Sequence, residues 1–94
     1  MVYLLIHHKV EDYGKWKPLF DEHEATRKAA GSQGARLLRN KDDSNDVVAI
    51  ISWPDRQHAQ AFIESPGLHT VMQNAGVLGT PEVLFLEEVE QTPA

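Results

Sequence analysis

Three segments of this chain are apolar at every position, and this feature most restricts how the chain can fold. They cover residues 2–6, 47–51 and 83–86, and their β-branched and aromatic side chains predict strands. An antiparallel strand with one face in water alternates apolar and polar residues, because successive side chains point to opposite faces. A sheet made of these segments therefore needs an apolar cover on both faces.

The stretch after the first strand, predicted over residues 2–8, has the residue spacing of a helix. Asp12 can cap the helix by accepting hydrogen bonds from free backbone N–H groups, and Gly31 suits its end. Pro18 lacks an N–H, so we predict a short first turn at residues 13–17 and the main helix from Pro18. One face repeats at intervals of three and four residues: Tyr13, Trp16, Phe20, His23, Arg27 and Ala30.

A second helical region follows the third strand. Asp55 is its expected N-cap, and Gly76 is its expected end. Pro66 disfavours helix at the residue before it, so a break is predicted at residues 65–67, with a further turn or two at 68–75. The side chains expected to face the core are Ala59, Phe62, Ile63, Leu68, Val71, Met72 and Ala75.

The remaining segments complete the order strand, helix, strand, strand, helix, strand. Residues 35–40 predict the second strand, residues 41–46 a polar turn, and residues 47–53 the third strand, so strands two and three form a hairpin. Residues 79–81 predict a loop before a last strand at 82–89. This order predicts a ferredoxin-like α+β fold, in which a four-stranded antiparallel sheet carries helices on one face.

The two faces of this sheet would be unequally covered, because two helices cover only one of them. A single domain at residues 1–90, with a frayed tail at 91–94, buries only roughly 60–65% of its unfolded surface. The chain has no cysteine, which excludes disulfides. We therefore predict a homodimer in which a second subunit covers the free face. The alternative is a monomer whose long side chains and loops shield that face.

Charge and hydropathy exclude several other classes of protein. The net charge of -5 argues against binding nucleic acid, which needs clustered Lys and Arg, and against docking on an anionic membrane. No apolar run reaches the roughly 18 residues that span a bilayer. The apolar start at residues 1–6 is too short for a signal peptide. A cytoplasmic location is therefore expected.

Motifs spread over most of the chain point to a known superfamily. They are Val10-Glu11-Asp12-Tyr13 leading to Trp16 and Phe20, Ser52-Trp53 ending the third strand, and Phe62-Ile63-Glu64-Ser65-Pro66 after it. They resemble the dimeric α/β-barrel superfamily, in particular proteins similar to antibiotic biosynthesis monooxygenases. The resemblance implies two sheets that form a barrel across a dimer, and a small-molecule cavity between each sheet and its helices.

The members of this superfamily have several activities, so the resemblance alone does not give one. They include cofactor-free oxygenases of polyaromatic substrates, haem-degrading enzymes, polyketide cyclases and isomerases. Haem-degrading relatives have a histidine where this chain has Phe62, and an asparagine in the first strand, where residues 2–8 have none. Only Trp53 fits their pattern, which argues against haem degradation.

The five histidines are the candidates for acid/base chemistry, since histidine titrates near neutrality. His23 lies on the apolar face of the first helix, and His69 follows the break in the second, so these two are the candidate catalytic residues. Each could instead be structural, His23 at the core edge and His69 on the surface. His7 and His8 point to opposite faces of the first strand, so at most one reaches a given cavity. No spacing typical of a metal site is present, and no cofactor is implied.

The aromatic residues and one methionine could form either a plain core or a pocket for a planar organic molecule. The candidate substrate-binding residues are Tyr3, Trp16, Phe20, Trp53, Phe62 and Met72. The first hypothesis is a cofactor-independent oxygenase or cyclase of an aromatic or polyketide-like molecule. The second is a non-catalytic dimeric binding or regulatory module. A hollow of roughly 300 Å³ or more containing a histidine would favour the enzyme, and a filled core would argue against it.

Overall fold

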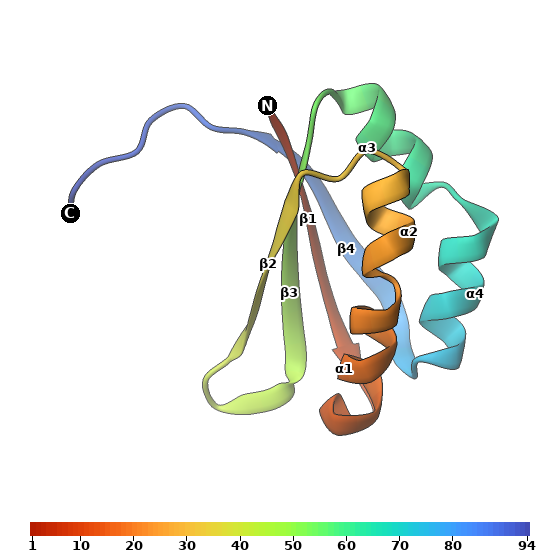
Figure 1. Cartoon of the computed structure of the whole chain (residues 1–94). Helices are drawn as coiled ribbons and strands as arrows, with labels where there is room; N and C mark the ends of the chain where they lie inside the picture. The colour runs from red at the N-terminus through yellow and green to blue at the C-terminus, as the bar shows by residue number, and fades with distance from the viewer.

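The computed structural model describes all residues from 1 to 94 and consists of one layer of strands and one layer of helices (Figure 1). The strands are β1 (Val2–Val10), β2 (Gly34–Asn40), β3 (Asp43–Trp53) and β4 (Val77–Glu87). The helices are α1 (Tyr13–Glu22), α2 (Glu24–Ala29), α3 (Arg56–Ile63) and α4 (Pro66–Asn74). Each of the two predicted helical regions is therefore a pair of shorter helices.

The strand order β2-β3-β1-β4 confirms the predicted ferredoxin-like arrangement. Every neighbouring pair of strands is antiparallel. The helices all lie on one face of the sheet, and Figure 1 shows no helix over the other face, on whose side the tail after β4 extends. No helix is long and apolar enough to cross a membrane.

The first helical region breaks at His23, and not before Pro18 as predicted. Pro18 lies inside α1, which runs without interruption from Tyr13. The bond that Pro18 cannot make would go to the Gly14 carbonyl, which lies in the first turn, where the helix tolerates a missing bond best. At the actual break, the guanidinium of Arg27 donates to the Phe20 carbonyl at 2.8 Å, in place of a backbone N–H. A long side chain, and not a proline, therefore accompanies the change from α1 to α2.

The start of α1 depends on the predicted cap. The Asp12 carboxylate accepts a hydrogen bond from the Gly14 N–H at 2.9 Å. Replacing Asp12 by alanine is expected to lower the free energy of unfolding by about 1 kcal/mol, measured by urea denaturation. Asp12→Asn keeps an oxygen acceptor and should stay close to the original protein. Equal losses in both variants would contradict the capping role.

All four strands are longer than the sequence indicated, and β3 and β4 differ most, because each begins several residues early. β3 begins at Asp43, so the turn shrinks to Lys41 and Asp42, and most of the polar segment that predicted a turn belongs to the strand. Polar side chains stay satisfied there by bonding to nearby backbone, since Asp43 Oδ1 accepts from the Asn45 N–H at 3.0 Å. The strand continues here because Asp43 pairs with Asn40 of β2 and Asp46 pairs with Lys9 of β1.

β4 begins at Val77, so the predicted loop at residues 79–81 is instead a bulge within the strand. The pairing with β1 shifts at this point, and these three residues lie opposite His8 alone. Gly79 has φ +67°, a conformation that other residues rarely adopt. Pro81 has no N–H to give to the ladder and is tolerated at bulges. Glycine and proline therefore indicate an irregular part of the strand here, and not a loop outside it.

The core lies between the helices and the sheet in two adjoining clusters. The larger one contains Leu4, Ile6, Ala49, Ile51, Trp53, Ala59, Phe62 and Leu68. The smaller one contains Val10, Trp16, Val47 and Ala75. The strand members alternate along β1 and β3, as the pleat requires. Asp55 caps α3 as predicted, accepting from the His58 N–H at 2.8 Å, and this places Ala59 and Phe62 against the sheet.

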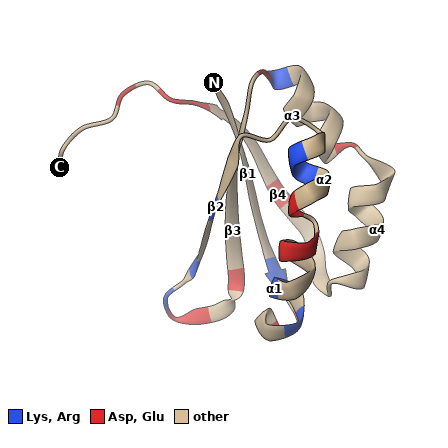
Figure 2. Ribbon diagram, viewed as in Figure 1, with Lys and Arg blue, Asp and Glu red and all other residues tan.

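The other face of the sheet, here called the open face, is also apolar. Strand pairing brings together on it Tyr3, Leu5, Leu38, Val48, Ile50, Leu84 and Leu86. Leu38 and Leu84 are 46% and 45% exposed, which is unusual for leucine side chains in a strand. Several charged residues lie toward the β2–β3 hairpin (Figure 2), where His7 Nε2 lies 2.7 Å from Asp46 Oδ1. The strands are therefore apolar on both faces, as the sequence indicated.

Candidate functional site

A cavity of about 50 Å³ lies between the helices and the sheet. Side chains from α1, α2, α3, α4, β1 and β3 contribute to its wall. Most of the wall is apolar, and the larger apolar side chains are Trp16, Phe20, Phe62, Leu68, Val71 and Met72. Three basic side chains join them, namely His8, His23 and Arg27, and no aspartate or glutamate does. The cavity is therefore an apolar space with only nitrogen-bearing polar groups in its wall.

His8 is one of the two buried polar groups of the cavity. It lies on the inward face of β1 beyond Leu4 and Ile6, and it is only 7% exposed. Neither ring nitrogen has a hydrogen-bond partner in the protein. Burial, helped by the nearby charge of His7, lowers the pKa of His8 to about 4, so the ring is neutral at physiological pH. A neutral imidazole with two free nitrogens can both donate to a bound molecule and accept from it.

The His8 ring is held in place by an aromatic neighbour. It meets the ring of Trp16 edge to face, with centroids 5.6 Å apart. Trp16 in turn stacks on Phe20 at 5.0 Å. This row of rings joins β1 to α1 and gives one wall of the cavity a flat aromatic surface.

Arg27 is the second buried polar group, at 6% exposed. Its guanidinium carbon lies 4.0 Å from the centre of the Phe20 ring, and one of its nitrogens donates to the Phe20 carbonyl. None of the ion pairs in the protein includes Arg27. Burial lowers the pKa of Arg27, while Glu24 and Asp21 partly offset this through space. Arginine stays charged at any ordinary pH, so the cavity contains a positive charge without a contacting counter-ion.

His23 lies at the break between α1 and α2 and is partly exposed. Burial and the positive charge of Arg27 lower the pKa of His23, which keeps this ring neutral at physiological pH as well. Its ring centre is 6.0 Å from that of Phe62. His23 therefore has contact with the cavity and with solvent, which a group that exchanges protons with bulk water needs.

Two surface grooves meet the cavity at His23 and Val71. One runs past Glu22 and Asn74, and the other passes Thr26. Both follow the boundary between the α1–α2 pair and α4, which are visibly separate in Figure 1. A small molecule can reach the cavity along this boundary, because the strands close the cavity from the other side.

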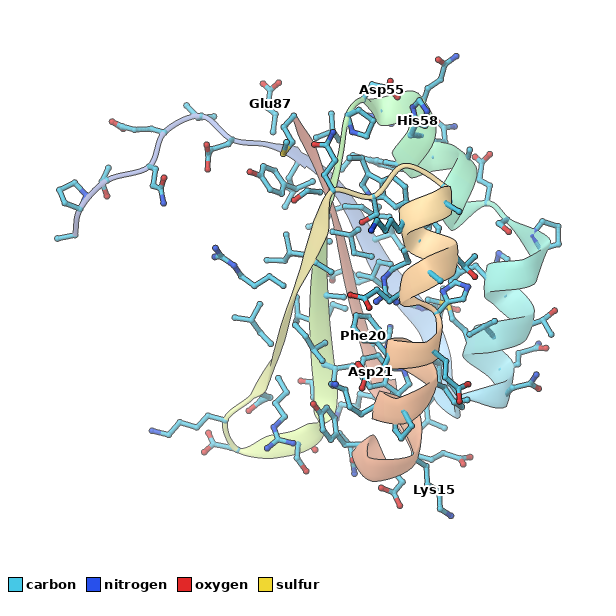
Figure 3. All side chains as sticks on the ribbon, viewed as in Figure 1. Lys15, Phe20, Asp21, Asp55, His58 and Glu87 are labelled. Atoms are coloured by element: carbon cyan, nitrogen blue, oxygen red, sulfur yellow. The ribbon has the colours of Figure 1, made fainter.

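The structure brings most of the predicted site residues together. His23, Trp16, Phe20, Phe62 and Met72 all line the cavity. Figure 3 labels Phe20 on α1, between that helix and the sheet. Their clustering agrees with the helical spacing of the sequence, which placed them on faces that pack against the same sheet.

Three other predicted site residues lie elsewhere. Trp53 is fully buried behind the wall, 5.0 Å from Phe62 between ring centres, and its Nε1 has no partner. Tyr3 lies on the open face and borders a groove there with Ser52. His69 is exposed on α4 and does not line the cavity. The break before α4 turns its apolar residue Leu68 inward, and the next residue along the chain therefore points outward.

Sequence reasoning missed the roles of His8 and Arg27. The signal for His8 was its parity with Leu4 and Ile6, which places it on the same side of β1. The signal for Arg27 was its place in an apolar helical row, where a charged side chain is rarely buried without a reason. No group of three or more His, Asp or Glu side chains is arranged to hold a metal ion.

Comparisons with known proteins agree on the fold. No protein-family profile matches the sequence, and no curated protein matches it at a significant level. Solved structures do match. The cofactor-independent oxygenase SnoaB from Streptomyces nogalater superposes with a TM-score of 0.80 at 21% identity, covering 99% of this chain and 97% of that one.

Two further structures give the same picture. An antibiotic biosynthesis monooxygenase has a TM-score of 0.75 at 20% identity, with 96% and 100% of the two chains covered. A candidate antibiotic biosynthesis monooxygenase from Bordetella bronchiseptica has a TM-score of 0.82 at 13% identity, with 95% and 97% covered. At these identities the likeness is one of fold. The chain therefore has the ferredoxin-like fold of proteins similar to antibiotic biosynthesis monooxygenases.

Proposed function

We propose that the protein is a small cofactor-independent enzyme that oxygenates or cyclises an aromatic or polyketide-like molecule. The observation that carries this proposal is the cavity itself, in which neutral His8 and His23 face an aromatic wall. The whole-chain likeness to SnoaB, a cofactor-independent oxygenase, supports the same reading. The protein is proposed to act in the cytoplasm.

The chemistry follows from what a cofactor-free site must do. With no outside reductant, the substrate has to supply all four electrons that dioxygen accepts. A CH₂ group next to an aromatic ring meets this need, because it becomes C=O while the second oxygen atom leaves as water. The step begins when a base removes one proton, and the resulting carbanion bonds to dioxygen to form a peroxide. The peroxide takes up a proton and loses water, which restores the base.

We assign the proton transfer to His23 because it is neutral and reaches both the cavity and solvent. Phe20, Phe62 and Met72 would hold the rings of the substrate. The same proton transfer would serve a cyclisation, in which the carbanion attacks a carbonyl of the same molecule. His69 is retained as a second candidate base only if α4 turns on binding.

The present cavity is too small for such a substrate. Its volume of about 50 Å³ compares with the roughly 300–1,000 Å³ of pockets for drug-sized ligands. Binding therefore requires the α1–α2 pair and α4 to move apart along the grooves at His23 and Val71. Without such an opening, the volume of about 50 Å³ falls below the roughly 300 Å³ that favours the enzyme, and it favours the second candidate function, a non-catalytic dimeric binding or regulatory module.

A homodimer through the open face belongs to this proposal. Seven apolar side chains of the open face have no cover within one chain, and the sheet of a second copy has the matching chemistry. The tail after β4 extends away from the helices, on the side of the open face, and its Val89 is 91% exposed (Figure 1). A partner subunit would give this segment something to pack against.

The test measures dioxygen uptake by the purified protein with a panel of phenolic and polyketide-like aromatic compounds. Isotopically labelled dioxygen should place one atom in the product and one in water. His23→Ala should lower the turnover rate roughly 10²- to 10⁴-fold, the usual share of a general base, with little change in stability. Gln57→Ala, at an exposed position on α3, is the matched control and should keep full activity. Binding of the panel without any reaction would favour the binding module instead.

A further inference from the structure

We propose that the cavity selects molecules that carry an anionic oxygen on an apolar or aromatic body, and that Arg27 is the residue that binds this oxygen. The inference names the substrate class of the function proposed above and rests on it.

No carboxylate lines the cavity to balance the positive charge of Arg27. The guanidinium is buried, contacts no carboxylate, and uses one nitrogen on the Phe20 carbonyl. Burying a charge without a partner is costly, so buried arginines in proteins are normally paired. Asp21 and Glu24 act on it through space from an outer groove that Arg27 and Phe20 line as well, and neither carboxylate lines the cavity. An anion inside the cavity would supply the missing partner.

The other polar groups of the cavity favour the same ligand. His8 has two unpartnered nitrogens in a buried position, and a neutral imidazole offers one N–H to an oxygen. His23 adds a second neutral ring at the entrance. Because no carboxylate lines the space, nothing repels a negative charge there. Since the rest of the wall is apolar, a fully hydrated inorganic ion fits poorly, whereas an apolar molecule with one carboxylate, phenolate or enolate fits well.

The route of entry agrees with this selection. The outer groove, which Arg27 and Lys28 also line, carries Asp21 and Glu24, and these carboxylates offset its positive charges. The groove along Thr26 and Val71 has no carboxylate in its wall. An anionic molecule therefore enters past His23 and Val71 and reaches Arg27 from the inside.

The experiment compares benzoate with benzamide, a neutral molecule of nearly the same shape, by calorimetric titration of the full chain. A charge-assisted hydrogen bond to Arg27 should make benzoate bind about tenfold tighter or more. Arg27→Met keeps an apolar stem but removes the charge, and it should abolish this preference. Lys28→Met removes the same charge at the neighbouring exposed position and should leave the preference intact.

A second probe tells carboxylates from phenolates. The phenolate of para-nitrophenol absorbs visible light and its neutral form does not, so binding at the site should shift its titration toward the phenolate. A benzoate preference without this shift assigns the site to carboxylates, and the shift extends the assignment to phenolates. Absence of binding by both anions, or an unchanged preference in Arg27→Met, overturns the proposal.

Arg27→Lys separates binding from a purely structural role at the break between α1 and α2. Lysine keeps the charge but loses the planar guanidinium, so part of the benzoate preference should return, with circular dichroism confirming that each variant is folded. If anions bind but no dioxygen is consumed, the oxygenase proposal fails while the anion site stands. If dioxygen is consumed but benzamide binds as well as benzoate, only the anion site fails.

Discussion

Replacing Ile50 by aspartate is expected to convert the protein into a monomer. Ile50 lies in the middle of the open face, paired with Leu5 on one side and Arg36 on the other. In a dimer built on this face, the new carboxylate would be buried against apolar side chains, and its desolvation would exceed what the contact gains. The original protein should sediment near twice the 10.6 kDa mass of one chain, and the variant near 10.6 kDa.

Ala25→Asp is the matched control, because it makes the same change from an apolar residue to aspartate at an exposed position on α2, in the helix layer and away from the open face. It should remain dimeric. If the original chain is already a monomer at micromolar concentration, the open face has another cover and the homodimer proposal is wrong. Circular dichroism should confirm that a monomeric Ile50→Asp chain keeps its helices and strands.

Acidification from pH 6.5 to pH 4 is expected to destabilise the protein by about 3 kcal/mol through His8 alone. The pKa of His8 is about 4 in the folded chain and 6.5 when unperturbed. In this window the unfolded chain takes up a proton at His8 and the folded chain does not, so stability falls as pH falls. Above about pH 7.5 the ring is almost entirely neutral in both states and contributes almost no slope. His7 opposes the charged form of His8, while Asp46 favours it weakly.

Urea denaturation across this pH range measures the effect. His8→Leu and His8→Asn differ in polarity but both remove the titrating ring, so both should lose most of the slope. A smaller slope of the same sign should remain, because the pKa of His23 is also lowered by burial. If both variants keep the full slope, His8 is not buried as a neutral ring, and its place in the cavity wall is wrong.

The ends of the helical regions and the aromatic residues of the cavity wall were predictable from local sequence patterns. Asp12 and Asp55 cap helices where expected, and Gly31 and Gly76 end them with φ of +112° and +80°. These signals depend on a few neighbouring residues, and tertiary contacts seldom override them. The cavity residues Trp16, Phe20 and Phe62 followed from helical periodicity for the same reason.

The errors concern places where distant parts of the chain meet. Pro18 and the Gly-Thr-Pro segment at 79–81 were expected to interrupt elements, but packing carries the helix and the strand through them. For His69 the structure shows the surface alternative, because the rotation of α4 after the helix break decides which side chain turns inward. That rotation is set by the packing of the helices on the sheet, which local sequence does not encode.

The sequence by itself determined the order of the elements, the ferredoxin-like fold and the two apolar faces of the sheet, because these depend on periodicity and on the alternation of side chains along a strand. Only the tertiary structure decided which polar groups share the cavity. His8 and Arg27 are 19 positions apart in the chain, and they line the same space because the α1–α2 pair packs across β1. The properties on which the proposed function rests, a neutral histidine and a buried cation without a contacting carboxylate, come from that burial.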